Sequence, residues 1–105
     1  MNGNDINLNF KIACVIVTYN NANGIGKTLD SLFSQKYPLE EIIIVDNASS
    51  DGTAALIKKN YPNVTLFAKE SNTGIGGGCA TGMGYAHEKK YDWIWIYKKY
   101  TNKYL

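Results

Sequence analysis

The sequence predicts an α/β domain with a Rossmann-like parallel sheet. Short apolar runs rich in β-branched residues alternate along the chain with segments of helical periodicity, which is typical of βαβ units. The 105 residues, 45% of them hydrophobic, fit one domain with a core of its own. Right-handed crossovers then favour the strand order 3-2-1-4, with helices on both faces of the sheet.

The first half of the chain contains two strands and two helices in alternation. The apolar run 11–18 is the first strand, and apolar residues at helical spacing predict a helix over 26–35. A second strand at 42–45 leads into a helix over 53–60, whose start can be capped by Ser50 or Asp51.

The second half repeats this alternation. Residues 64–68 form a short third strand, and a glycine-rich loop at 71–78 runs into a helix that reaches about Lys90. The run 91–97 alternates enough to be a fourth strand, with Trp93 and Trp95 on one face and Ile94 and Ile96 on the other.

The amino-acid composition of the chain argues against several classes of function. Every basic residue is a lysine, and the formal charge is only +2, so the arginine fork suited to nucleic acids is missing and nucleic-acid binding is disfavoured. No apolar run approaches the ~20 residues of a membrane span, and no signal peptide is recognisable. Cys14 and Cys79 lack metal-site spacing and are expected to be reduced and buried, which favours a cytoplasmic location.

Three segments are expected. Residues 1–10 are polar and asparagine-rich, which predicts a flexible leader. Residues 11–97 hold the α/β domain, and residues 98–105 form an atypical tail rich in lysine and tyrosine.

The acid that ends the second strand is the main candidate for contact with a small molecule. The apolar run stops at Asp46, and a polar segment rich in turn formers follows through Thr53. Ligands of open α/β sheets bind outside the carboxyl ends of the strands, which is where Asp46 would lie. The alternative is a solvated aspartate in a turn.

Two glycine-containing segments resemble phosphate-binding loops incompletely. The first, residues 21–28, has Gly26, Lys27 and Thr28 of a P-loop, but Asn21 stands at the first glycine position. The second, residues 74–82, fits the dinucleotide fingerprint in neither register. Its glycines are explained equally by a helix N-terminus open to an anion or by tight packing of that helix on the sheet.

Three motifs occur in order: V-I-V-T-Y-N at 15–20, I-I-I-V-D-N-A-S-S-D-G-T at 42–53 and N-T-G-I-G-G-G at 72–78. Together they resemble the N-terminal nucleotide-binding half of the family 2 glycosyltransferases, which are inverting enzymes of the GT-A fold. The third motif is most similar to the rhamnosyl- and galactofuranosyltransferase branch. The resemblance extends over residues 11–96.

The resemblance implies a site for a nucleotide-diphosphate sugar of the UDP or dTDP type. Thr18 and Tyr19 would line the nucleobase pocket, with the Tyr19 ring available for stacking, and Asp46 would accept a hydrogen bond from the ring N–H of a pyrimidine. Asn72 and Gly74 would shape the floor of the site. The implied site residues are Thr18, Tyr19, Asn20, Asp46, Asn72 and Gly74.

The sequence departs from the family where the catalytic metal is held. After a strand such as Trp93 to Ile96 these enzymes carry acids that bind Mg or Mn, whereas this chain continues with Tyr97, Lys98 and Lys99. Lysine cannot bind a hard cation, so no metal ligand or cofactor is expected in this chain. The acceptor-binding region of the family, which carries the general base, is absent as well, so no catalytic residue is expected. The sequence is therefore interpreted as a truncated glycosyltransferase that keeps part of the donor pocket and lacks the reaction.

Two other functions remain open at this level. A P-loop-like protein would bind nucleotide through Gly26, Lys27 and Thr28. A non-enzymatic module would form a homo-oligomer through the fourth strand and the tail, because apolar strand edges invite pairing.

Overall fold

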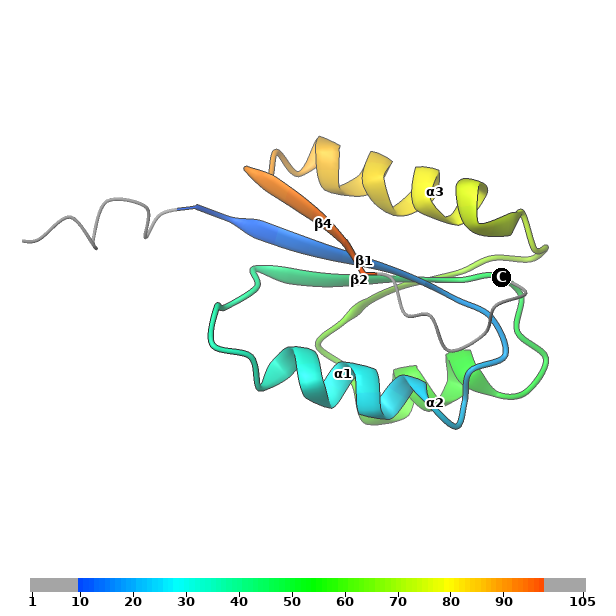
Figure 1. Cartoon of the computed structure of the whole chain (residues 1–105). Coiled ribbons are helices and arrows are strands. Elements are labelled where there is room, and N and C mark those ends of the chain that lie inside the picture. The colour runs from blue at the N-terminus through cyan, green and yellow to red at the C-terminus, as the bar shows by residue number, and fades with distance from the viewer. Residues whose placement is uncertain (1–9, 98–105) are drawn as a thin grey trace, which may run out of the picture.

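Residues 10–97 are described by a computed structural model, and the predicted tail and all but the last residue of the predicted leader lie outside this range. Within it, four parallel strands form one sheet in the order β3-β2-β1-β4, which confirms the predicted order (Figure 1). The strands are β1 (Ile12–Thr18), β2 (Glu41–Asp46), β3 (Thr65–Ala68) and β4 (Trp93–Tyr97).

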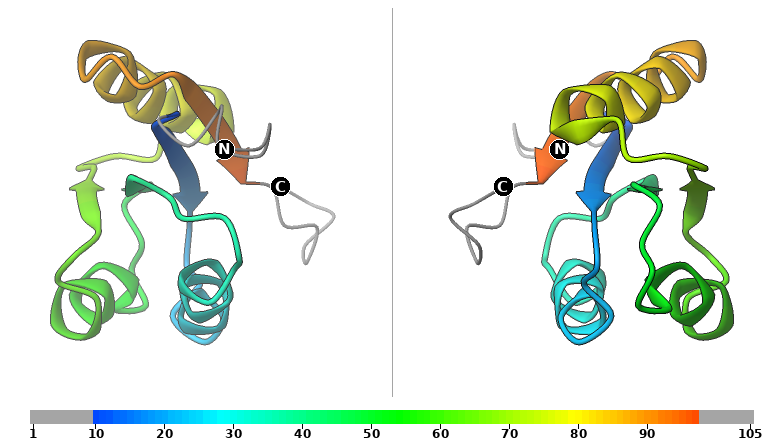
Figure 2. Two further views of the ribbon diagram at one scale, coloured as in Figure 1. Left: turned by 90° about the vertical axis from the view of Figure 1, so that its left-hand side faces the viewer. Right: turned by 90° about the vertical axis from the view of Figure 1, so that its right-hand side faces the viewer.

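Helices cover both faces of the sheet, as predicted. Helices α1 (Ile25–Phe33) and α2 (Thr53–Asn60) lie on one face, and α3 (Gly74–Glu88) lies on the other, as the end-on views show (Figure 2). The residue before α2 is Gly52, with φ of 89°, and Asp51 Oδ1 accepts the N–H of Thr53 at 3.1 Å. Asp51 therefore supports the start of α2 as expected, from one position outside the helix.

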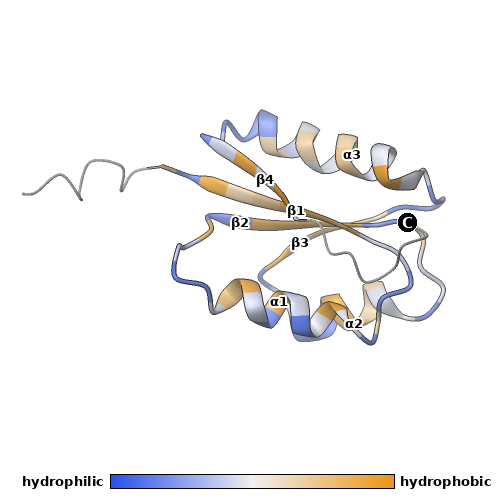
Figure 3. Cartoon of the chain, viewed as in Figure 1, coloured by the Kyte–Doolittle hydropathy of each residue, from blue (hydrophilic) through white to orange (hydrophobic). Residues whose placement is uncertain are grey.

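The core consists of two apolar layers, one on each face of the sheet. Strand residues alternate between the layers, so that the central strands β1 and β2 are apolar on both faces, and both contain orange, hydrophobic stretches in Figure 3. Cys14, predicted to be buried, is fully buried, and burial raises the pKa of its thiol to about 12. Cys79 was also predicted to be buried but is only half-buried, because it lies on a partly exposed side of α3. The two layers contain the buried strand residues Cys14, Ile16, Ile42 and Ile44 towards α1 and α2, and Ala13, Val15 and Ile43 towards α3. Val45 of β2 is fully buried as well.

Helix α3 lies unusually close to β1 because two of its glycines face the strand. A Cβ atom at Gly82 would lie 2.4 Å from Val15 Cγ1, and one at Gly78 would lie 2.6 Å from Val17 Cγ1. Because α3 begins at Gly74, the prediction of a loop at 71–78 is wrong over residues 74–78, which are helical. Glycine is a poor helix former, but here close packing against the sheet outweighs its low propensity.

The start of β2 carries a hydrogen-bonded carboxylate that joins four segments. Glu41 accepts hydrogen bonds from Thr65 of β3, from Tyr85 OH of α3 at 2.7 Å and from Tyr91, which precedes β4. Partial burial by itself raises the pKa of Glu41. The hydrogen bonds from Thr65, Tyr91 and Tyr85, together with the Lys89 charge, outweigh this effect and hold the pKa below its ordinary value of 4.5.

The close approach of α3 predicts opposite effects for two alanine substitutions on the same helix. Gly82→Ala should lower the free energy of unfolding by about 1–3 kcal/mol, because its Cβ overlaps the buried Val15 side chain. Gly84→Ala is the matched control: nothing lies within 4 Å of its added Cβ, so it should raise stability by about 0.5–1 kcal/mol. Urea unfolding measures both, and equal stabilisation by the two variants would contradict the packing explanation.

The Glu41 cluster predicts a specific pH dependence. Because the folded-state pKa of Glu41 is lowered, its contribution to stability is present above the unfolded-state pKa and is lost as the pH falls through the folded-state pKa. Wild type should therefore be more stable than Glu41→Gln at neutral pH, and the difference should shrink below about pH 4.5. Thermal unfolding across this range tests it, with exposed Glu40→Gln as the control for a change of overall charge.

Candidate functional site

The carboxyl ends of β1 and β2 bring two of the three motifs together. Thr18 is the register partner of Asp46, so the last residues of both strands are neighbours at one edge of the sheet. The strand order also reverses beside β1, where α3 carries the chain from β3 past β1 to β4. Ligands of open α/β sheets bind at such a switch point, which makes this edge the candidate site.

Asp46 is buried at this edge, with only 2% of its surface exposed, and is not a solvated turn residue. Its Oδ1 accepts the Ser49 hydroxyl at 2.5 Å, and its Oδ2 accepts the Ser49 N–H at 3.1 Å. An ionised carboxylate has about four acceptor positions, so each Asp46 oxygen keeps one position that no donor of the described residues fills.

The three residues at and after the end of β1 differ in burial and in hydrogen bonding. Thr18 is buried, and its hydroxyl oxygen has no hydrogen-bond partner within the described range. Tyr19 is 44% exposed, which leaves its ring free to stack. Asn20 has a positive φ of 47°, and its Oδ1 accepts the N–H of Ser50 at 2.8 Å.

The loop that follows β1 is held by the loop that follows β2. Asn21 donates its N–H to Thr53 Oγ1 at 3.0 Å, and Ala22 donates its N–H to Asp51 Oδ2 at 3.0 Å. In a P-loop such amides would be turned towards phosphate. Thr28 is also buried in the core instead of being accessible to a metal, so the P-loop-like alternative lacks its phosphate cradle.

Asn47 connects the third motif to the first two. This residue is 2% exposed; its Nδ2 donates to Gly74 O at 2.9 Å, and its backbone N–H donates to Thr18 O at 2.9 Å. Its Oδ1 also accepts the Thr73 N–H at 3.4 Å, a longer contact. The implied site residues Asn72 and Gly74 therefore lie beside the ends of β1 and β2.

Helix α3 begins at this junction. Gly74 has φ of 76°, and its N–H is bonded to Asn72 Oδ1 at 2.7 Å. Thr73, the N-cap residue, makes no side-chain capping bond, and its hydroxyl accepts a hydrogen bond from Lys69 Nζ at 2.6 Å. The positive end of the helix dipole thus points to the same edge as Asp46.

Sequence reasoning overlooked Asn47 and Ser49, although both belong to the second motif. A signal was present: buried loop backbone must have hydrogen-bond partners, and short polar side chains directly after a buried strand are the nearest ones.

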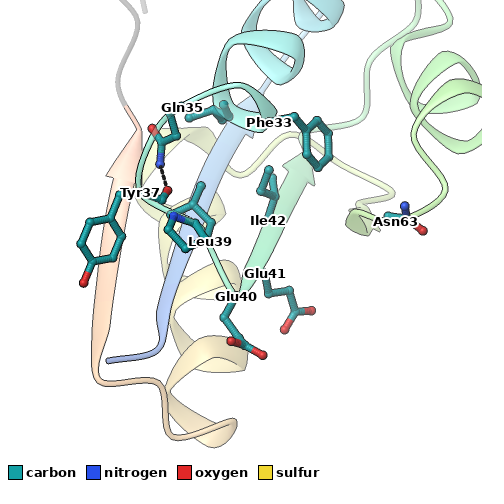
Figure 4. A pocket seen from close by; sticks show the side chains of 10 residues that line it. Phe33, Gln35, Tyr37, Leu39, Glu40, Glu41, Ile42 and Asn63 are labelled. Atoms are coloured by element: carbon teal, nitrogen blue, oxygen red, sulfur yellow. Dashed lines mark hydrogen bonds between the residues drawn. The ribbon is translucent and has the colours of Figure 1, made fainter. Parts of the chain in front are cut away.

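A concave region elsewhere does not suit a nucleotide. A hollow of about 280 Å³ lies at the amino end of β2, opposite to the candidate site, and Glu40 and Glu41 are in its lining (Figure 4). Two carboxylates would repel a diphosphate. Gln35 Nε2 donates a hydrogen bond to Tyr37 O at 2.9 Å. Both residues line the hollow and belong to the segment that connects α1 to β2.

Over residues 10–97 no three histidine, cysteine or acidic side chains gather in a way that could hold a metal ion. In the same range, no helix combines the length and the apolar character that crossing a membrane requires.

Comparison with known proteins gives consistent results. The sequence profile of Glycosyl transferase family 2 matches residues 13–97. The succinoglycan biosynthesis protein ExoO of Rhizobium meliloti is 33% identical over 79% of this chain and 23% of its own length. The galactofuranosyltransferase GlfT1 of Mycolicibacterium smegmatis is 29% identical over 81% of this chain and 28% of its own length.

A solved structure shares the fold. The mannosyltransferase PcManGT from Pyrobaculum calidifontis, in complex with GDP-Man and Mn2+, superposes with a TM-score of 0.62 and 28% identity. The match covers 71% of this chain and 24% of that chain. This chain therefore spans about a quarter of the length of these three proteins.

Proposed function

The chain belongs to Glycosyl transferase family 2, and we propose that it supplies the nucleotide-sugar-binding part of a glycosyltransferase that transfers a sugar from a nucleotide-diphosphate sugar to an acceptor hydroxyl. The observation that carries this proposal is the meeting of all three motifs at one edge of the sheet, joined by Asn47. The proposed domain is residues 11–97.

The proposed donor is a UDP or dTDP sugar, bound in the manner that the resemblance implies. Tyr19 stacks on the base, and Asp46 accepts the ring N–H with its remaining acceptor positions. Asn72 and Gly74 form the floor, where the uncapped start of α3 favours the negative diphosphate. The galactofuranosyltransferase relative supports the rhamnosyl and galactofuranosyl branch, and two free cysteines suit a reducing cytoplasm.

Metal binding has no support from the described residues. The mannosyltransferase structure contains Mn2+, but residues 10–97 of this chain offer no cluster of ligands for such an ion. No step of the proposed function is therefore assigned to a metal.

Nucleotide binding distinguishes this proposal from the P-loop-like alternative. UDP should bind weakly, and Asp46→Ala should weaken binding by about 1–3 kcal/mol because a hydrogen bond to a charged acceptor is lost. Lys27→Ala, which changes an exposed residue of α1, is the control and should leave UDP binding unchanged. Calorimetry measures both, and ATP binding that depends on Lys27 but not on Asp46 would reject the proposal.

We also propose a homo-oligomer through β4, as the exposed face of this strand favours. Trp93 is 60% exposed and Trp95 is 40% exposed. They lie on the opposite face of β4 from Ile94 and Ile96, as the alternation predicts, and the two isoleucines pack on the side of α3. The tail that was expected to take part lies outside the described residues.

Sedimentation tests this association. The full chain should sediment as a dimer or larger assembly at high micromolar concentration, because exposed aromatic area on an edge strand invites pairing. Trp93→Lys should shift it towards the monomer, and Lys58→Glu, an exposed change on α2, should have no effect. A wild-type protein that remains monomeric would contradict the proposal.

A further inference from the structure

Ser49 lies at the point where the loops after β1 and β2 meet. Its hydroxyl is bonded to two partners, the backbone N–H of Asn20 at 2.8 Å and Asp46 Oδ1 at 2.5 Å. Its own N–H is bonded to Asp46 Oδ2 at 3.1 Å. One residue thus contacts both oxygens of the candidate ligand-binding carboxylate and the neighbouring loop.

The direction of this chain of hydrogen bonds is determined by the groups in it. A backbone N–H can only donate, so the Ser49 oxygen accepts from Asn20 and the single hydroxyl proton is left for Asp46. The carboxylate therefore receives two donors from one residue, one on each oxygen. Ser49 therefore sets the orientation of the Asp46 carboxylate. It also determines which acceptor positions of the two carboxylate oxygens remain unfilled.

Backbone strain is concentrated around the same residue. Asn20 and Ala48 have positive φ values of 47° and 60°, and they are two of the three non-glycine residues in the described range that do. Asparagine tolerates this region, whereas alanine adopts it at an energetic cost. The strained turn at Ala48 directs both donors of Ser49 back to Asp46, and such strain persists where the surrounding contacts enforce it.

We propose that Ser49 is a positioning residue for nucleotide recognition: it holds the buried Asp46 carboxylate in the orientation that accepts a ring N–H of the base. This role rests on the proposed function. The exposed neighbour Ser50 does not share it, since its hydroxyl makes only a 3.5 Å contact with Asn20 Oδ1.

The test compares two ligands that differ only at the ring nitrogen, which carries a hydrogen in one and a methyl group in the other. Calorimetry with the full chain measures the affinity for UDP and for its N3-methyl analogue, which cannot donate. Wild type should prefer UDP by about tenfold or more, and Ser49→Ala should weaken UDP binding about tenfold while changing analogue binding little. The preference for UDP should therefore be largely lost in Ser49→Ala.

Conservative variants and a control separate positioning from folding. Ser49→Thr keeps the hydroxyl and should restore the preference, Ser49→Cys should be intermediate because a thiol donates weakly, and Ser50→Ala should match wild type. If Ser49→Ala does not fold, the preference for UDP over the N3-methyl analogue is compared between Ser49→Thr and Ser49→Cys. A smaller preference in Ser49→Cys supports the role of the hydroxyl, and equal preferences contradict it.

Three outcomes would overturn the inference in distinguishable ways. No UDP binding by wild type would overturn the proposed function and this role together. UDP binding that is unchanged in Ser49→Ala would overturn the role of Ser49 alone. Equal weakening of both ligands would show a structural effect and would also overturn this role alone.

Discussion

The contact between α3 and β1 exists only because Gly78 and Gly82 have no side chains. A Cβ at either position would lie within 2.6 Å of a valine of β1, a separation that packed atoms cannot adopt. The same hypothetical Cβ at Gly78 would lie 3.3 Å from Asn47 Nδ2. The distance between α3 and the sheet therefore also determines whether the Asn47 side chain can reach Gly74 at the start of that helix. The arrangement of the candidate site depends on this contact.

The polar side chains at the carboxyl edge hold the loops after β1 and β2 to one another. None of the N-cap residues of the three described helices, Gly24, Gly52 and Thr73, makes a side-chain capping bond. Asp51 accepts the N–H of Thr53 at the start of α2, Thr53 Oγ1 accepts the N–H of Asn21, and Thr73 is bonded to Lys69. The result is a set of loops held to one another around the ends of β1 and β2. Amides in the first turn of α3 remain oriented towards this edge.

Two carboxylates at opposite ends of β2 show how a structural acid differs from a candidate binding acid. Glu41 receives hydroxyl donors from three residues on three different segments, which spreads its bonds over the fold and lowers its pKa. Asp46 receives both of its donors from a single residue in its own turn. The first arrangement ties elements together, whereas the second fixes the carboxylate and leaves acceptor positions open. The hydroxyl of Thr18, the register neighbour of Asp46, has no partner among residues 10–97 and adds to this difference.

Sequence alone determined the parallel sheet, the strand order 3-2-1-4 and the edge at which the candidate site lies. These follow from the alternation of apolar runs with helical periodicity and from the handedness of crossovers, which are local or general properties. Tertiary structure decided what depends on distances between segments far apart in the chain. The glycines at 74–78 are helical because β1 lies against them, although their propensity predicts a loop. Asn47 and Ser49 gained their roles because their partners, Gly74 and Asn20, are 27 and 29 residues away, and only the folded sheet brings these pairs within hydrogen-bonding distance.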